Sequence, residues 1–311
     1  MGVGGYKQIN KALNICAFDD YLAAQQAQLP KLPDVEHISP RVIRILGQNP
    51  GKFTLQGTNT YIVGTGPQRL LIDTGQGIPE WASLISSTLH DMNITLSHVL
   101  LSHWHGDHTQ GVPDLLTMYP YLSDSIYKNS AGKGQKDISD GQIFRVEGAT
   151  VRALHAPGHS HDHMCFVIEE DDAMFTGDNI LGHGSSAVQE LGTYMSTLEK
   201  MRAAGCAVGY PAHGVVLKNL KSKISIELSQ KLRREAQVLK GLNEAKCAGE
   251  KTSPTLSVKE LVTLIYGPAL DEEVRMMALE PFIDEVLRKL TNDGKVAFRV
   301  LSGQKRWFSL A

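Results

Sequence analysis

The sequence predicts an α/β fold, a layered sandwich of strands and helices followed by a smaller helical domain. Between Ser39 and Val216, apolar runs of strand length alternate with amphipathic helical stretches. After Val216, long amphipathic helices take over and end in two short strands. A hydrophobic content of 42% and a charged content of 21% are typical of a globular protein with a large buried core.

Residues 1–38 are predicted to form an N-terminal arm. Apolar residues recur at helical spacing in this segment until Pro30 and Pro33 end the pattern. The pattern favours an arm that caps the core. Covering a site, or pairing with a second copy in a homo-oligomer, are alternatives that the sequence leaves open.

Residues 39–220 are predicted to form the catalytic domain. Strands, a helix, a buried strand and a further helix follow one another, and two strand pairs come after them. The predicted segments are 41–47, 58–64 and 69–75 (strands), 79–92 (helix), 96–103 (strand), 111–119 (helix), 142–158 and 163–178 (strand pairs). Loops at the strand ends are the expected location of a functional site.

Residues 221–311 are predicted to form a separate C-terminal domain. Helices are expected over 222–246, 257–267 and 275–294, followed by strands over 295–301 and 305–311. Three helices and a two-stranded hairpin predict a winged-helix-like arrangement.

The segment from Leu100 to Val112 places three histidines and an aspartate within six residues. Residues two apart on an extended chain point the same way, so His103 and His105 can share one cation. Asp107 and His108 follow where the chain must turn, and their side chains can serve an adjacent cation. One such histidine alone would usually have a structural role.

Three further candidate ligands each follow a predicted strand. They are His159, Asp178 and His213. Imidazole and carboxylate groups suit Zn²⁺ or Mn²⁺, and a carboxylate can bridge two ions. Two cations about 3.5–4 Å apart can hold a hydroxide that attacks a substrate at neutral pH. The sequence therefore predicts a site for two divalent metal ions.

The H-W-H-G-D-H motif, with the downstream histidine, Gly-Asp and Pro-Ala-His-Gly, resembles the metallo-β-lactamase superfamily. The resemblance implies an αβ/βα sandwich with two metals at its edge, and catalytic roles for Asp107 and Asp178. It assigns one cation to His103, His105 and His159, the second to Asp107, His108 and His213, and a bridging role to Asp178. Asp73, in Leu-Leu-Ile-Asp-Thr-Gly, would support the ligand loop rather than bind metal.

Two further stretches narrow the resemblance. Residues 176–201 and the C-terminal domain are similar to the lactamase-beta-2-like branch, and residues 10–64 resemble fungal atrochrysone carboxyl acyl-carrier-protein (ACP) thioesterases. These enzymes serve non-reducing polyketide synthases in secondary metabolism. The resemblance implies release of an aromatic polyketide from its thioester on the carrier protein by hydrolysis, with Claisen-type cyclisation as an alternative.

Two other function classes fit parts of the pattern. The same branch includes metal-dependent endoribonucleases, but a net charge of −2 and an aromatic content of 6% argue against nucleic acid as a partner. A metal-free scaffold on the same fold is the third hypothesis, and seven intact candidate ligands argue against it.

Several residues are weaker candidates. Gln56, Asn59, His183 and Tyr194 are predicted as substrate contacts, against plain roles in turns, caps or the core. His161 and His163 could be alternative ligands, although supporting or surface roles are favoured. A cluster of basic residues could bind an acidic carrier protein or form an ordinary solvated helix face: Lys218, Lys221, Lys223, Lys231, Arg233 and Arg234.

The sequence favours a cytoplasmic protein with no membrane partner. It contains no run of 18 apolar residues, and its first residues lack the apolar core of a signal peptide. Its four cysteines are scattered without a C-x-x-C pair, which indicates reduced thiols.

Overall fold

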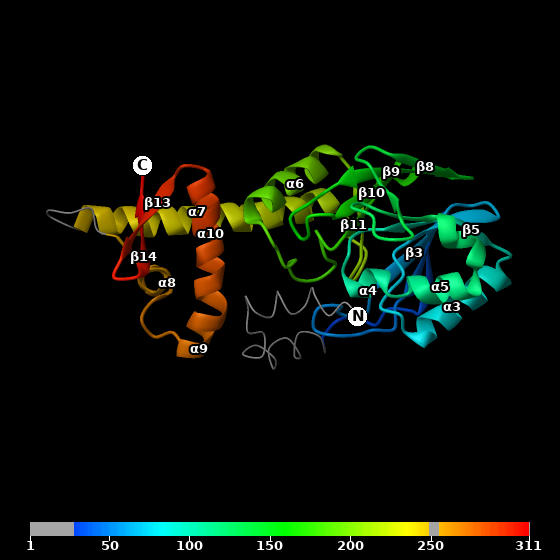
Figure 1. Cartoon of the computed structure of the whole chain (residues 1–311), viewed down its shortest axis with the longest axis horizontal. Helices are drawn as coiled ribbons and strands as arrows, with labels where there is room; N and C mark the ends of the chain where they lie inside the picture. The colour runs from blue at the N-terminus through cyan, green and yellow to red at the C-terminus, as the bar shows by residue number, and fades with distance from the viewer. Residues whose placement is uncertain (1–27, 249–254, 311) are drawn as a thin grey trace. The chain divides into compact units, whose positions relative to one another are not determined.

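The computed structural model describes residues 28–248 and 255–310, which fall into two compact units that meet in sequence at Ser225 and Ile226 (Figure 1). The predicted arm lies largely outside the described residues. Its last part belongs to the first unit, because strand β1 (Val35–Ser39) pairs antiparallel with β2 (Val42–Leu46). The sheet therefore begins earlier in the chain than the arm boundary at residue 38 predicts.

The described part of the first unit contains a seven-stranded sheet in sequential order, β1 to β7. The pairs from β1 to β4 are antiparallel and those from β4 to β7 are parallel. The remaining strands are β3 (Asn59–Val63), β4 (Gln68–Ile72), β5 (Thr95–Leu101), β6 (Ile126–Lys128) and β7 (Lys136–Asp137).

A second sheet of five strands in the described residues has the order β12-β11-β10-β9-β8. Its strands are β8 (Ile143–Val146), β9 (Ala149–His155), β10 (Met164–Ile168), β11 (Ala173–Gly177) and β12 (Val208–Pro211). From residue 28 to Ser225, the helices are α3 (Pro79–Asp91), α4 (Gly106–Thr109), α5 (Val112–Met118), α6 (Leu191–Ala203) and the 3₁₀ turns η2 (Pro120–Asp124) and η3 (Glu169–Asp171), besides the start of a helix that continues into the second unit.

Alternate residues of each strand point to opposite sides of its sheet. Each sheet therefore has one apolar face that packs against the other sheet. Tyr61 and Leu70 of the first sheet meet Phe166 and Phe175 of the second in one buried cluster. Ile62 faces the other way and packs with Trp81 and Ile85 of α3. Helix α6 covers the outer face of the second sheet, where Met201 Sδ lies 4.0 Å from Cys165 Sγ of β10. The layers are helix, sheet, sheet, helix, as predicted.

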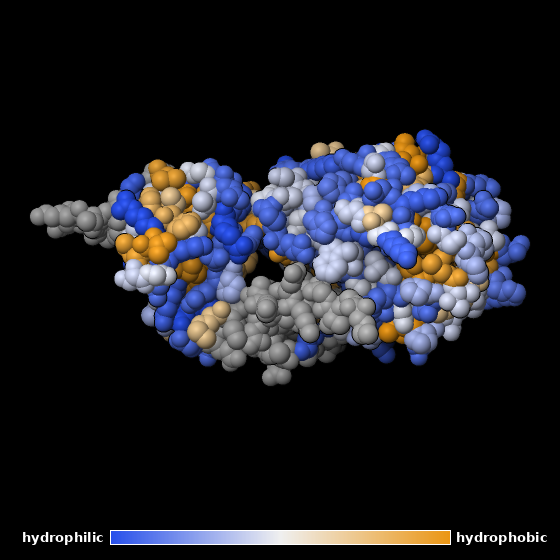
Figure 2. Space-filling view, in the orientation of Figure 1, coloured by the Kyte–Doolittle hydropathy of each residue, from blue (hydrophilic) through white to orange (hydrophobic). Residues whose placement is uncertain are grey.

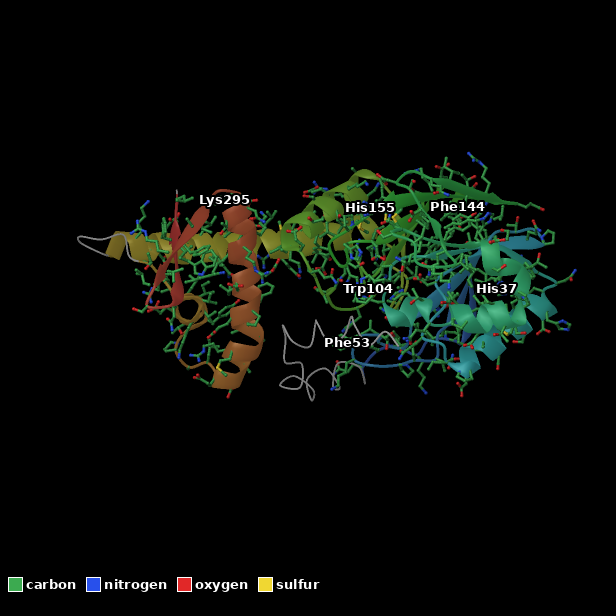
Figure 3. The ribbon with its side chains drawn as sticks, viewed as in Figure 1. His37, Phe53, Trp104, Phe144, His155 and Lys295 are labelled. Carbon is green, nitrogen blue, oxygen red and sulfur yellow. The ribbon has the colours of Figure 1, made fainter. Side chains whose placement is uncertain are left out.

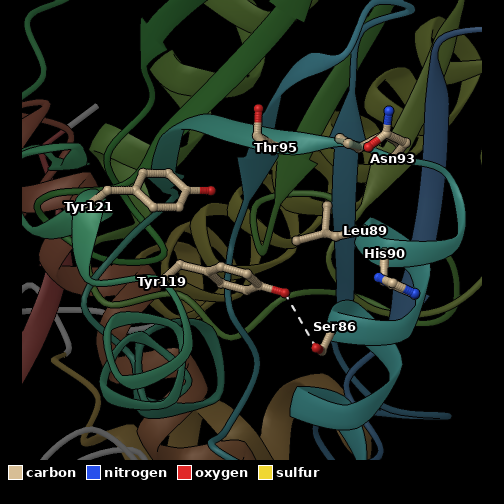
Figure 4. Close-up of a pocket in the computed structure, with 8 residues that line it drawn as sticks. Ser86, Leu89, His90, Asn93, Thr95, Tyr119 and Tyr121 are labelled. Carbon is tan, nitrogen blue, oxygen red and sulfur yellow. Dashed lines mark hydrogen bonds between the residues drawn. The ribbon is translucent and has the colours of Figure 1, made fainter.

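One open pocket of the first unit lies where β5 begins. Tyr119, Tyr121, His90 and Thr95 are among its lining residues, and the Tyr119 hydroxyl donates a hydrogen bond to Ser86 Oγ (Figure 4). The metal-ligand motif follows the other end of the same strand, about 20 Å away at the rise of an extended chain. The pocket is therefore separate from the candidate metal centre.

The second unit contains the predicted helices and hairpin. Its elements within residues 226–248 and 255–310 are α7 (Leu220–Ala248, from Ile226 onward), α8 (Val258–Tyr266), α9 (Glu272–Val274), a π-helical turn η4 (Arg275–Leu279), α10 (Glu280–Asn292), β13 (Val296–Leu301) and β14 (Gln304–Ser309). In Figure 2, hydrophobic residues gather around the hairpin, where Phe298, Val300 and Leu301 are exposed. The winged-helix relationship stays a prediction. Within the described residues, no helix has both the length and the apolar character that a membrane span needs.

Candidate metal centre

The end of strand β5 and the short helix α4 place the first four candidate ligands. His103 follows the strand, and His105 is still extended at the residue before α4. The single helical turn of α4 then directs Asp107 and His108 back toward the strand end, and both side chains are buried. Trp104, labelled in Figure 3, marks this segment.

Four buried residues converge in a first group: His103, His105, His159 and Asp178. Nδ1 of His105 lies 2.8 Å from Nε2 of His103 and 3.0 Å from Nε2 of His159. Oδ2 of Asp178 lies 3.4 Å from the same His159 nitrogen. These atoms surround a space in which they could all ligate one cation.

A second group consists of Asp107, His108, Asp178 and His213. Nε2 of His213 lies 3.2 Å from both Oδ2 of Asp107 and Oδ1 of Asp178. Nε2 of His108 lies 3.3 Å and 3.5 Å from the same two oxygens. Asp178 thus presents Oδ2 to the first group and Oδ1 to the second, which is the geometry of a bridging carboxylate.

Asp73 orients the ligand loop through hydrogen bonds. Its backbone has a positive φ of 59°, and its carboxylate accepts from both the backbone N–H and the hydroxyl of Ser102, at 2.7 and 2.8 Å. Its Oδ2 also lies 2.8 Å from Nδ1 of His108. A proton on Nδ1 leaves Nε2 of His108 available to a cation, so Asp73 has the supporting geometry that the sequence predicts.

Two further contacts fix ligands that come from the second sheet. Nδ1 of His159 lies 2.8 Å from the carbonyl oxygen of Ala187, which directs Nε2 toward the first group. His163 is fully buried, and its Nε2 accepts from the backbone N–H of Asp178 at 3.0 Å. His163 therefore supports the backbone of Asp178, and a supporting role is one that the sequence favoured for it over ligation.

The pKa values of the candidate ligands differ: some histidines are kept neutral, the form that binds a metal, and other groups are kept charged. Burial lowers the pKa of His105 to about 4, and burial also holds the pKa of His103 well below its usual value. Burial alone would lower the pKa of His213, but Asp178 and Asp107 raise it to about 9. Burial would raise the pKa of Asp178, yet His213 and His108 hold it well below its usual range.

Unpaired buried atoms test whether a cation fits here. Among the described residues, both carboxylate oxygens of Asp107, Nε2 of His108 and Oδ1 of Asp178 are buried and make no well-formed hydrogen bond, although Oδ2 of Asp107 and Oδ1 of Asp178 lie 3.2–3.5 Å from imidazole nitrogens. Burying such groups unpaired is costly, and divalent cations satisfy them. Three imidazoles with a carboxylate, and two imidazoles with two carboxylates, are ligand sets that suit Zn²⁺ or Mn²⁺.

The structure gives the positions of the residues predicted as substrate contacts. Asn59 is buried, and its amide donates to the carbonyl oxygens of Pro211 and Gly214 on either side of His213. Tyr194 is buried, and its hydroxyl donates to the carbonyl of Asn179. Both side chains bond the backbone beside a candidate ligand, and their contact with substrate stays a prediction. His183 is exposed, and the Gln56 amide donates to the Pro30 carbonyl.

Sequence reasoning missed two supporting groups. Ser102 bonds Asp73 and lies 3.0 Å from Nδ1 of His103, and its position directly before the ligand motif was the only available signal. The carbonyl of Ala187, which contacts His159, lies 28 residues away in sequence and leaves no pattern that could be read.

Comparisons with known proteins agree with this geometry. A family model described as the metallo-beta-lactamase superfamily matches residues 53–213. The atrochrysone carboxyl ACP thioesterase AgnL7 of Paecilomyces divaricatus is 66% identical over 100% of this chain and 98% of its own. The atrochrysone carboxyl ACP thioesterase AacuM of Aspergillus aculeatus is 64% identical over the full length of both chains.

Solved structures share the fold at low identity. A beta-lactamase domain protein from Burkholderia ambifaria superposes with a TM-score of 0.68 at 16% identity, over 91% of this chain and 98% of that chain. At this identity the likeness concerns the fold alone.

Proposed function

The chain belongs to the metallo-beta-lactamase superfamily, and from that premise we propose that it is a metal-dependent thioesterase. Its substrate is an aromatic polyketide held as a thioester on an acyl carrier protein, and its product is the free acid. The observation that carries the proposal is the pair of buried ligand groups that share Asp178. Full-length relatives named as ACP thioesterases support the choice of substrate.

We infer that the two groups hold two divalent ions, Zn²⁺ or Mn²⁺. His103, His105 and His159 would hold one, Asp107, His108 and His213 the other, and Asp178 both. When bound, such a pair supplies a hydroxide at neutral pH and polarises the thioester carbonyl. Asp73, Ser102 and His163 keep the ligand atoms directed inward, so that the site is preorganised before substrate arrives.

The leaving group places few demands on the protein. A thiolate departs without strong protonation, so the chain needs no dedicated general acid. Asp107 and Asp178 stay ionised, because nearby histidines hold the pKa of both carboxyls well below the usual range against the effect of burial. Hydrolysis is the proposed outcome. Claisen-type cyclisation at the same site would give a ring-closed product of different mass.

The carrier protein is the proposed partner, and the structure changes which basic residues can contact it. Lys223 donates to the carbonyl of Gly184, Lys231 pairs with Glu227 at 3.5 Å, and Arg234 lies over the ring of Phe282 at 4.9 Å. Lys218, Lys221 and Arg233 are the exposed members of the predicted cluster. Lys218 and Lys221 belong to the first unit, and we propose that docking on an acidic partner depends on these two.

Hydrolysis of a carrier-bound polyketide by the purified protein tests the proposal. We expect metal-loaded protein to release the free acid and the carrier thiol in equal amounts, as measured by mass spectrometry and thiol titration. Asp178→Ala should abolish release, because it removes a ligand from both groups. Turnover that persists after complete chelation would refute the metal-dependent mechanism, and a product lacking one water would indicate cyclisation instead.

The ribonuclease alternative has no specific observation in its favour. The relatives described above are named as thioesterases, and the site geometry does not select a phosphodiester.

A further inference from the structure

A buried ion pair joins the two sheets beside the candidate metal centre. Lys128 is the last residue of β6, and Asp162 lies in the loop between β9 and β10. Nζ of Lys128 lies 2.6 Å from Oδ2 of Asp162, and the two side chains are only 8% and 0% exposed. Moving two charges out of water costs free energy even when they pair with each other. A pair that is nevertheless buried here indicates that the two segments it joins must be held in place.

Each partner is close in the chain to a candidate ligand. Lys128 pairs in register with Leu101, the last residue of β5, and His103 follows two residues later. Asp162 follows His159 by three residues. The ion pair therefore connects a ligand-bearing segment of the seven-stranded sheet with one of the five-stranded sheet.

The contacts of Asp162 continue toward His159. Its second oxygen, Oδ1, accepts from the hydroxyl of Ser160 at 2.8 Å, and Ser160 is fully buried. The Ser160 carbonyl in turn accepts from the backbone N–H of Gly158, on the other side of His159. Lys128 is held as well, because its ammonium also donates to the carbonyl of Asn129 at 2.6 Å. A shift of the His159 loop would break this chain of bonds.

We propose that the Lys128–Asp162 ion pair is a positioning element that places His159 against His103 and His105. It sets the affinity of the first ligand group for a divalent cation, and affects the second group little. His159 is the candidate ligand that lies on the β9–β10 loop with Asp162, and none of the second group lies there.

A backbone hydrogen bond also joins the two sheets near the ion pair, so the pair can be removed without removing every link between them. The N–H of Met164 donates to the carbonyl of Ser102 at 2.7 Å, so the same junction keeps a second connection without the ion pair. Removing one charge would leave the other buried and unpaired, which alone can destabilise the protein. Removing both charges in one variant eliminates that penalty and isolates the positional effect.

The experiment titrates metal-free full-length protein with Co²⁺ and follows both binding equivalents by calorimetry and the visible spectrum. The variants are D162N, K128M and the double variant K128M/D162N. H105A and H213A identify which equivalent belongs to which group. K240M is the matched control, since it breaks an exposed lysine–glutamate pair of 3.7 Å between Lys240 and Glu244 in the second unit.

We expect the first-group equivalent to bind about 10–100-fold more weakly in the double variant, with wild-type thermal stability and an unchanged second equivalent. K240M should bind both equivalents as wild type does. The inference is overturned if the double variant binds both equivalents normally, or if both weaken equally. If a single variant does not fold, the double variant decides.

This inference rests on the proposed two-cation site, and the two can fail separately. A wild-type protein that takes up no Co²⁺ would refute the proposed site itself. Two equivalents in the wild type and no change in the double variant would remove only the role of the ion pair.

Discussion

His213 and His108 are the residues whose protonation should report metal binding most directly. The carboxylates Asp178 and Asp107 outweigh burial and raise the pKa of His213 to about 9, and that of His108 lies well above its usual value. Both imidazoles are then protonated at pH 7 in metal-free protein, and both must lose a proton to ligate. We expect release of about two protons on metal uptake at pH 7.

As the pH increases toward 9, His213 loses its proton before metal binds. The number of protons released on metal uptake should therefore fall, and the apparent affinity for metal should rise. Calorimetric titration in two buffers of different ionisation enthalpy measures it. Identical heats in both buffers at pH 7 would contradict the assignment of these histidines as protonated ligands.

Gly177 is the residue at which the smallest change should disturb the bridging aspartate. Its φ is +51°, and an added Cβ would lie 2.5 Å from Nε2 of His163, the atom that accepts from the Asp178 N–H. We expect Gly177→Ala to weaken metal binding at both positions, and to destabilise the protein by about 1–3 kcal/mol. Gly134→Ala is the control, because Gly134 also has a positive φ but a Cβ there meets nothing within 4 Å. Equal losses of metal affinity in both variants would show that the effect comes from the strained backbone alone and not from contact with His163.

Among the elements, strands with a continuous apolar pattern were predictable and short paired strands were not. β10 is read from local sequence because all five of its residues are buried, and β5 because it ends in a buried run of three apolar residues. β6 has only three residues, and it is a strand because it pairs in parallel with both β5 and β7. The same limit applies to the site. Its seven candidate ligands follow recognisable strand ends, whereas the contact of Lys128 with Asp162 depends on non-local packing.

Helix α8 offers a test of stability that is separate from the metal centre. Ser257 accepts from the Glu260 N–H at 3.2 Å, and the Glu260 carboxylate accepts from the Ser257 N–H at 2.7 Å. This reciprocal cap satisfies two backbone donors, so Ser257→Ala should cost about 1 kcal/mol. Ser257→Thr retains the cap and should stay near wild type. Hydrogen exchange over residues 258–266 measures the effect, and altered metal content in Ser257→Ala would contradict this separation.

At the scale of the whole molecule, bound cations should stabilise one unit and not the other. The candidate ligands come from both sheets of the first unit: His103, His105, Asp107 and His108 follow β5, while His159, Asp178 and His213 follow strands of the second sheet. A bound ion therefore connects the sheets, and its removal leaves buried carboxylates facing each other. Free metal at 100 times its dissociation constant would add about 2.7 kcal/mol to the free energy of unfolding.

Chelation should accordingly lower hydrogen-exchange protection around residues 102–108, 156–163 and 211–214, and leave residues 255–310 unchanged. The change should be reversed when Zn²⁺ or Mn²⁺ is restored. In Asp178→Ala protein, added metal should give little protection, because both ligand groups have lost a member. Protection lost equally from both units would mean that the metals stabilise the chain in some way other than by connecting the two sheets.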